Sequence, residues 1–181
     1  MPLTTYRVLE YIDTWAVDVS DSLDKAGVKN EVLVWPRVES VSMKCFDWSR
    51  KQYLAPCILS QLHSIFQKFI SKGRYVVALG YLDGYDYGLN FVFGEANPSL
   101  SIAVVFTKRL DPLTYGLSRD YNLYVERVSK EIVHELGHLL GLGHCSLREC
   151  VMSFSNSVPE VDMKTRFFCS KCVGRLKALN I

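Results

Sequence analysis

A short stretch late in the chain concentrates side chains that could bind a metal ion. It contains three of the four histidines, His134, His138 and His144, together with Glu135 and Gly141. If the stretch is helical, side chains four residues apart lie on one face, so His134 and His138 can reach the same ion. Gly141 permits a sharp turn at the helix end, which would bring His144 back to that ion. Three imidazoles leave a fourth position for water, an arrangement typical of catalytic zinc.

Glu135 lies beside the face that carries His134 and His138, where its carboxylate can touch a metal-bound water without being a ligand. Two histidines four residues apart on an amphipathic helix are more often ordinary core or surface residues. The addition of Glu135, Gly141 and His144 in register favours the metal site over that alternative. We therefore expect a zinc metalloprotease, in which a zinc-activated water attacks the peptide bond and Glu135 is the general base.

Four of the six cysteines gather after the third histidine, at Cys145, Cys150, Cys169 and Cys172. Their spacing is C-x4-C, then a longer gap, then C-x2-C. Four thiolates at such spacings suit a closed, tetrahedral, structural zinc site. The alternative is two disulfides or unpaired buried thiols, but the close final pair favours metal. With the histidine site, this predicts two zinc ions per chain, one catalytic and one structural.

The composition of the chain excludes several classes of protein. The 181 residues carry a formal charge of +2 and are 49% hydrophobic, which excludes wholesale disorder and a chain that is basic throughout. No apolar run reaches the roughly 18 residues of a membrane helix, and residues 1–7 lack the features of a secretory signal. We therefore expect a cytoplasmic protein without a membrane partner. Disulfides are rare in such proteins, so Cys45 and Cys57, which lack metal-site spacing, are interpreted as buried apolar fillers.

The spacing of hydrophobic residues and the positions of turn-forming residues predict the helices and strands that must position these groups. The expected helices cover residues 13–26, a segment that follows Pro56, 118–140 and 173–179, and the expected strands cover 31–35, 75–81, 89–93 and 102–107. The short loop between the second and third of these strands predicts that they are neighbours. Strands mixed with helices before one long late helix predict a three-layer α/β domain.

The pattern H-E-x-x-H-x-x-G-x-x-H, which begins at His134, resembles that of the metzincin metalloproteases. The run from His134 to Met152 has a cysteine directly after the third histidine and is followed by Phe168-Cys169-Ser170-Lys171-Cys172. This combination resembles the archaemetzincins, which join the metzincin helix to a four-cysteine zinc site. The segments Val161-Asp162-Met163-Lys164 and Leu89-Asn90-Phe91-Val92-Phe93-Gly94-Glu95-Ala96 are also similar to that family.

The resemblance implies an α/β (α+β) metzincin-like fold with a twisted mixed sheet and an antiparallel edge strand. It implies an N-terminal subdomain with the active-site helix, residues 1–144, and a small zinc-stapled C-terminal subdomain, residues 145–181, with the catalytic zinc between them. By the same resemblance, residues 89–93 form the edge strand that pairs with an extended substrate, and Met152 forms the methionine turn beneath the zinc. Several metzincins have a tyrosine two residues after that methionine, where this chain has Phe154.

Two alternatives to the peptidase remain open at this stage. The first is a catalytically weak or inactive protein that keeps zinc and binds peptides, which the loss of the tyrosine hydroxyl at Phe154 would fit. The second is nucleic-acid binding around the cysteines, where five basic residues occur: Lys164, Arg166, Lys171, Arg175 and Lys177. We expect these charges to form a solvated face. The predicted partner is thus a peptide or protein substrate, with no nucleic acid, and the predicted state is a monomer.

Overall fold

The computed structural model describes residues 10–70 and 74–179, so the prediction about a signal in residues 1–7 lies outside the described residues. The helices are α2 (Ile12–Ala26), α3 (Ala55–Phe66), α4 (Tyr121–Leu139), α5 (Val158–Met163) and α6 (Ser170–Ala178). The strands are β1 (Phe46–Asp47), β2 (Gln52–Leu54), β3 (Val76–Gly80), β4 (Gly84–Tyr85), β5 (Gly94–Asn97) and β6 (Ile102–Phe106). Short 3₁₀ helices cover Met43–Cys45, Pro98–Leu100, Lys108–Leu110 and Pro112–Tyr115.

The main sheet has the strand order β3-β6-β5 and is mixed. β3 runs parallel to β6, and β5 runs antiparallel to it, with Gly94 opposite Val105 and Asn97 opposite Ile102. All five residues of β6 are buried, as expected for a central strand. β3 therefore has β6 as its neighbour, and the prediction that it pairs with residues 89–93 is wrong. A second small sheet has the order β1-β2-β4.

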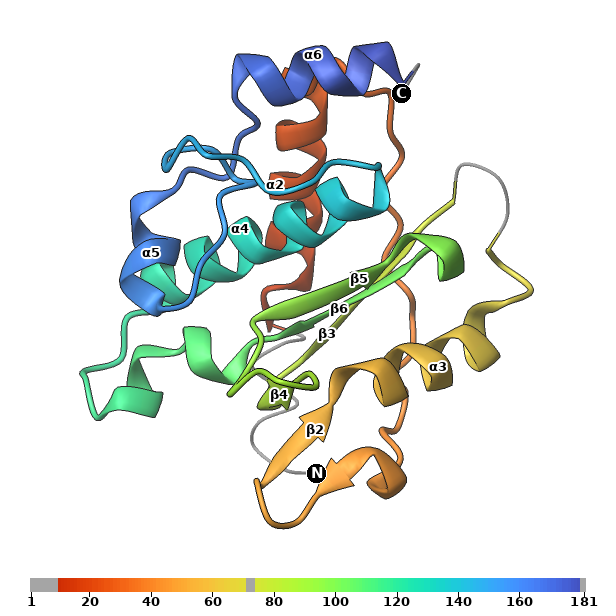
Figure 1. Ribbon diagram of the computed structural model, residues 1–181, viewed down its shortest axis with the longest axis vertical. Helices are drawn as coiled ribbons and strands as arrows, with labels where there is room; N and C mark the ends of the chain where they lie inside the picture. The colour runs from red at the N-terminus through yellow and green to blue at the C-terminus, as the bar shows by residue number, and fades with distance from the viewer. Residues whose placement is uncertain (1–9, 71–73, 180–181) are drawn as a thin grey trace.

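The main sheet lies between two helical layers, with α4 and α2 on one face and α3 on the other (Figure 1). The side chains of β6 alternate between these layers. Ala103 and Val105 belong to the core beneath α4, whereas Val104 and Phe106 belong to the core beneath α3. This arrangement confirms the predicted three-layer α/β architecture.

The antiparallel edge strand is β5, and the prediction that it covers residues 89–93 is wrong by a few residues. The carbonyl groups of Leu89 and Asn90 each accept a hydrogen bond from the guanidinium of Arg50, at 2.9 Å. Val92 forms only an isolated antiparallel bridge, with Gly84, so the segment forms no continuous ladder, although its apolar composition favours a strand. The strand begins only at Gly94, where pairing with β6 starts.

The helix predictions are confirmed in type and corrected at their ends. The first helix was expected to begin at Asp13, but α2 begins at Ile12 with Tyr11 at its N-cap and no side-chain cap. Gly27 ends α2 in the left-handed conformation, with φ of 77°. The long helix begins at Tyr121, because the Asp120 carboxylate accepts a hydrogen bond from the backbone N–H of Leu123 at 2.9 Å.

Two segments differ from the sequence prediction in kind. Residues 31–35 are extended and exposed but form no strand, since none of the described strands pairs with them. Their β-branched and aromatic residues favour strand locally, but a strand also needs a partner. None of the expected helices lies between residues 140 and 173, yet this part of the chain contains α5. That helix is only six residues long and depends on tertiary contacts with α4.

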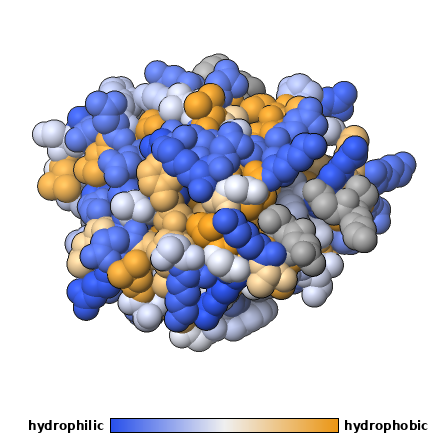
Figure 2. Space-filling view, turned by 90° about the horizontal axis from the view of Figure 1, so that it is seen from above, coloured by the Kyte–Doolittle hydropathy of each residue, from blue (hydrophilic) through white to orange (hydrophobic). Residues whose placement is uncertain are grey.

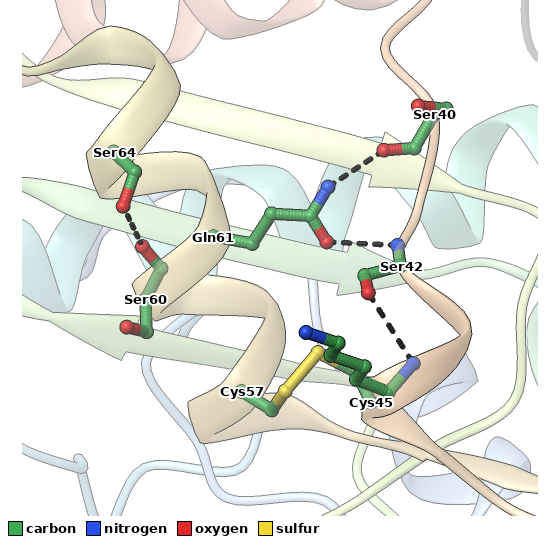
Figure 3. The surroundings of a disulfide bond; sticks show 8 residues. Ser40, Ser42, Cys45, Cys57, Ser60, Gln61 and Ser64 are labelled. Atoms are coloured by element: carbon green, nitrogen blue, oxygen red, sulfur yellow. Dashed lines mark hydrogen bonds between the residues drawn. A yellow bond between two sulfur atoms is a disulfide. The ribbon is translucent and has the colours of Figure 1, made fainter.

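Cys45 and Cys57 form a disulfide, so their interpretation as apolar fillers is wrong (Figure 3). The bond joins the 3₁₀ helix at Met43–Cys45 to the first turn of α3. The same junction is tied by Gln61, whose side chain donates to the carbonyl of Ser40 at 2.7 Å and accepts from the N–H of Ser42 at 2.9 Å. The β1–β2 hairpin between the two cysteines brings them together, and their sequence spacing alone gave no sign of it.

No described helix combines the length and the apolar character needed to cross a membrane. Figure 2 views the molecule from the end at which α6 lies and shows hydrophilic and hydrophobic residues interspersed on that face.

We expect Cys57→Ala to lower the free energy of unfolding by about 3 kcal/mol, because the disulfide closes a loop between residues 12 apart and restricts the unfolded chain. Thermal unfolding with and without a non-chelating reductant measures this effect. The reductant should lower the melting temperature of the parent to that of the variant and leave the variant unchanged. An equal response of the two proteins, or no response of the parent, would show that the bond does not form.

Candidate metal centres and active site

The last two turns of α4 carry the first two predicted zinc ligands. α4 lies across the sheet in contact with β5 and β6, and both His134 and Glu135 are buried. The Nε2 atoms of His134 and His138 lie 3.1 Å apart. Two imidazoles at about 2.05 Å from a tetrahedral zinc ion would have nitrogen atoms about 3.3 Å apart. The two side chains thus point to one position.

Hydrogen bonds from the other ring nitrogens fix how both imidazoles are turned. Nδ1 of His134 donates to the carbonyl of Val151 at 2.7 Å, and Nδ1 of His138 donates to the carbonyl of Leu142 at 2.8 Å. A carbonyl cannot donate, so each Nδ1 carries the proton and each Nε2 presents its lone pair. This is the form in which a histidine binds a metal ion, with its orientation held by a second partner.

A glycine turn places the third histidine. Gly141 has φ of 88°, and two backbone hydrogen bonds close the helix end, from Gly141 N–H to His138 O and from Leu142 N–H to Gly137 O. The chain then reverses, and the ring of His144 lies 5.4 Å from that of His134 and 4.9 Å from that of His138. Within the three histidines, one ligand nitrogen from each lies within 4.8 Å of the others.

The electrostatic surroundings favour the neutral imidazoles that metal binding requires. Burial lowers the pKa of His134 well below its usual value, and the charges of Lys164 and the neighbouring histidines add to this effect. Burial also lowers the pKa values of His138 and His144. The three rings are therefore uncharged at neutral pH and can act as ligands without first losing a proton.

Glu135 lies beside the three histidines and against the edge strand. Burial raises the pKa of its carboxyl group well above the usual range, the nearby Glu131 carboxylate raises it further, and Lys164 opposes both. The backbone of Gly94, the first residue of β5, lies directly on this side chain. A Cβ atom placed on Gly94 would be 2.5 Å from Oε1 of Glu135. Only glycine fits there, and the start of the edge strand is held next to the carboxylate.

Met152 is fully buried beneath the last turns of α4. It meets the helix at Gly137, where an added Cβ would collide with the Met152 sulfur and with the ring of Phe168. The carbonyl of Met152 accepts a hydrogen bond from the N–H of Cys145 at 2.8 Å. The methionine turn thus supports both the helix and the chain that follows the third histidine.

The four late cysteines are free thiols that face one another in a second cluster. The sulfur atoms of Cys145 and Cys169 are 3.8 Å apart, and those of Cys150 and Cys172 are 3.7 Å apart. Four sulfurs at about 2.3 Å from a tetrahedral zinc ion would be about 3.8 Å apart, which matches these two distances, and all four sulfurs lie within 4.8 Å of one another.

One thiol of this cluster has a lowered pKa. Burial opposes ionisation of Cys169, but hydrogen bonds from the backbone N–H of Cys172 and from the neighbouring thiols outweigh it and lower its pKa to about 7. Burial raises the pKa of Cys172. A bound cation would stabilise all four thiolates at once.

The sequence analysis named Phe154 and Lys164 without placing them against the candidate site, and it did not identify Glu131. Phe154 is half exposed, and its ring lies 4.8 Å from that of His144. Glu131 is buried one turn before Glu135, a position that helical spacing could have revealed. Lys164 was expected on a solvated basic face but is 2% exposed and forms an ion pair with Glu131.

A second of the five basic residues around the cysteines is also paired. Arg166 pairs with Asp21 at 2.8 Å and with Asp18 at 3.6 Å, so its charge is compensated. With Lys164 buried and Arg166 paired, two of the five residues do not belong to a solvated basic face.

The fold and the site have relatives among known proteins. A model of the family described as peptidase family M54 matches residues 5–178. The archaemetzincin of Aeropyrum pernix is 45% identical over 134 residues, which are 74% of this chain and 70% of that protein. The archaemetzincin of Sulfolobus acidocaldarius is 41% identical over 150 residues, which are 83% of this chain and 82% of that protein.

Two solved structures share the fold. The crystal structure of archaemetzincin from Methanopyrus kandleri has a TM-score of 0.77 at 37% identity and covers 99% of this chain and 89% of its own. The zinc-dependent peptidase from Methanocorpusculum labreanum has a TM-score of 0.74 at 30% identity, with 90% of this chain and 93% of its own covered.

These relationships and the fold define a zinc metallopeptidase. The chain belongs to peptidase family M54, and three of the four relatives named above are archaemetzincins. The predicted family and the predicted class of enzyme are confirmed. Its substrate is accordingly a peptide or protein.

We expect Gly137→Ala to destabilise the protein by about 1–3 kcal/mol, because the new methyl group overpacks the contact with Met152 and Phe168. Gly174→Ala is the matched control, since this glycine of α6 has open space around its Cα and alanine is the better helix former. Denaturant unfolding should show a loss for the first variant and an unchanged or higher stability for the second. Equal stabilities of Gly137→Ala and the parent would contradict the close approach of α4 to the methionine turn.

Proposed function

We propose that the chain hydrolyses peptide bonds at the three-histidine site, with Glu135 as the general base and with His134, His138 and His144 as the ligands of a catalytic zinc ion. One observation carries this proposal. Three imidazoles, of which that of His134 is buried and that of His144 is exposed, each bring one ring nitrogen to within 4.8 Å of the others, and the buried Glu135 follows His134 on the same helix. This combination of groups suits hydrolysis by an activated water and serves no evident purpose in packing.

Zinc at this position would polarise the scissile carbonyl and make its water a nucleophile at neutral pH. The residues of the chain perform the remaining tasks. Glu135 accepts the proton of the attacking water and delivers it to the leaving amine. The carbonyls of Val151 and Leu142 hold two of the imidazoles in the required tautomer.

An extended peptide on the open side of β5 is the substrate geometry that the site supports best. β5 pairs with β6 on one side, and among the described strands none pairs with its other side. A peptide can therefore add to the sheet through backbone hydrogen bonds. Because Gly94 lies against Glu135, a peptide bound along β5 would pass the general base. The edge that binds the substrate thus begins at Gly94.

We further propose that Cys145, Cys150, Cys169 and Cys172 hold a second, structural zinc ion, so that the loaded chain contains two. The segment 145–181 would then be a small C-terminal subdomain stapled by metal, and residues 1–144 the subdomain that carries α4. Cys145 directly follows His144, so the staple would also anchor the third catalytic ligand. We expect the loaded protein to be a monomer.

The family does not favour the alternative of an inactive peptide-binding protein, although Phe154 offers no hydroxyl at the rim of the site. The two functions differ in one outcome. A peptidase loses turnover when its base is removed, whereas a binding protein has no turnover to lose.

We expect Glu135→Ala to retain both zinc ions and to lose peptide hydrolysis by at least 10²–10⁴-fold, the usual contribution of a positioned proton acceptor. Glu149→Ala, which removes an exposed carboxylate, is the control and should keep full activity. Zinc content and turnover of a cleaved peptide are measured on the same samples. Loss of the catalytic zinc from Glu135→Ala would make Glu135 a ligand, and undiminished cleavage would assign the activity to another site.

The two zinc ions should differ in lability. Four thiolates in a closed shell hold zinc more tightly than three imidazoles and a water, so a mild chelator should remove one ion per chain well before the second. Metal analysis during the titration, together with the count of reactive thiols, follows the two steps. A single zinc ion in the fully loaded protein, or thiols that are released together with the first ion, would contradict this assignment.

A further inference from the structure

Lys164, at the end of α5, is buried although it carries a charge. Its side chain is 0% exposed, and lysine is almost never fully buried unless it is paired. Its Nζ lies 2.8 Å from Oε1 of Glu131 on α4 and donates to the carbonyl of Ser153 at 3.3 Å. The ammonium group therefore connects the active-site helix to the residue that follows Met152. Removing a charged group from water has a large free-energy cost, so we asked what the buried Lys164 does at this place.

The Ser153 contact completes a series of three along the methionine turn. The carbonyl of Val151 accepts from His134, and that of Met152 accepts from the N–H of Cys145, the neighbour of His144. The carbonyl of Ser153 accepts from Lys164. Three successive carbonyls are thus bound, the first by His134, the second by the residue after His144 and the third by Lys164. The first bond orients a proposed zinc ligand, the second lies next to one, and the third fixes the end of the same short segment.

The positive charge of Lys164 also acts on two buried carboxyl groups of α4. Glu131 and Glu135 lie one turn apart on α4, and both are buried. Two buried carboxylates at this spacing repel each other. The ammonium group of Lys164 compensates them and holds Glu131 in place, and its field also reaches Glu135 and His134.

A second ion pair joins the same two helices one turn before Glu131 on α4. Arg127 of α4 forms a two-point pair with Asp162 of α5, with both N–O distances 2.7 Å, and also donates to the carbonyl of Leu110. This pair provides a natural control, because its loss weakens the docking of α5 on α4 without touching the Met152 segment or Glu131.

We propose that Lys164 is a positioning residue of the peptidase site, which holds the Ser153 carbonyl and the Glu131 carboxylate so that the methionine turn keeps His134 and Glu135 in their working arrangement. The inference rests on the proposed function for its catalytic consequence and on the structure for its effect on metal binding. Lys164 acts through its two partners and does not touch the substrate.

The test compares three variants of the full chain: Lys164→Met, the double variant Lys164→Met/Glu131→Met, and the control Asp162→Asn. The double variant removes the ion pair without leaving a buried charge, and such replacements are often neutral or stabilising. It therefore separates the effect of the ion pair with Glu131 from the effect of the hydrogen bond to the Ser153 carbonyl. Each protein is measured for melting temperature, for the affinity of the histidine site for Co²⁺, whose imidazole and thiolate sites differ in visible spectrum, and for kcat and KM.

Lys164→Met should lower the melting temperature and weaken metal binding at the histidine site by about 10–100-fold, the usual effect of losing a group that orients metal ligands. The double variant should recover the melting temperature but not the metal affinity, and its kcat should remain low at unchanged KM. Asp162→Asn should lower the melting temperature while metal affinity and kcat stay within about twofold of the parent, since it leaves the Ser153 contact intact.

Recovery of both metal affinity and kcat in the double variant would reduce Lys164 to a charge partner of Glu131 and overturn the proposal. Parent-like metal affinity in Lys164→Met would overturn it as well. If Lys164→Met does not fold, the double variant decides. If the parent cleaves no peptide, the proposed function fails, but the Co²⁺ affinities still decide whether Lys164 positions the histidines.

Discussion

The close contact between the last turns of α4 and the segment 151–153 is the constraint on which the rest of the site depends. Gly137 allows the contact, because any side chain there would collide with Met152. The approach brings the Val151 carbonyl within 2.7 Å of Nδ1 of His134, which sets the tautomer and the direction of the ring. A helix held further away would still carry its histidines, but their lone pairs would not be directed to one position.

Both sides of this contact are held from elsewhere in the fold. α4 lies on the face of β5 and β6, so the helix and the edge strand share one core and Glu135 meets Gly94. The segment 151–153 lies between Cys150 and α5, which docks on α4 through the ion pair of Arg127 with Asp162 and the buried ion pair of Lys164 with Glu131. The cysteine cluster holds the two ends of this C-terminal part together, and Cys145 links the cluster to His144. The positions of the histidine cluster and the cysteine cluster therefore both depend on one short segment of chain.

Much of this could be predicted because the information is local. The spacing of His134 and His138, the turn at Gly141 and the cysteine pairs each depend on a few neighbouring residues. The rest depends on partners distant in sequence. Arg50 binds the carbonyls that precede the edge strand, a hairpin brings Cys45 to Cys57, and Lys164 looks like any surface lysine until α5 packs on α4. Residues 31–35 show the converse, a good strand sequence without a paired neighbour.

The central claim is that hydrolysis depends on the three-histidine site and not on the cysteine cluster. It is tested most directly by a peptide library incubated with the zinc-loaded parent and with His138→Ala, with cleavage read by mass spectrometry and zinc counted in both proteins. The account predicts that the parent cleaves peptides with two zinc ions, and that the variant keeps one zinc ion, remains folded and cleaves nothing. Cleavage of the same bonds by His138→Ala at a similar rate would contradict it.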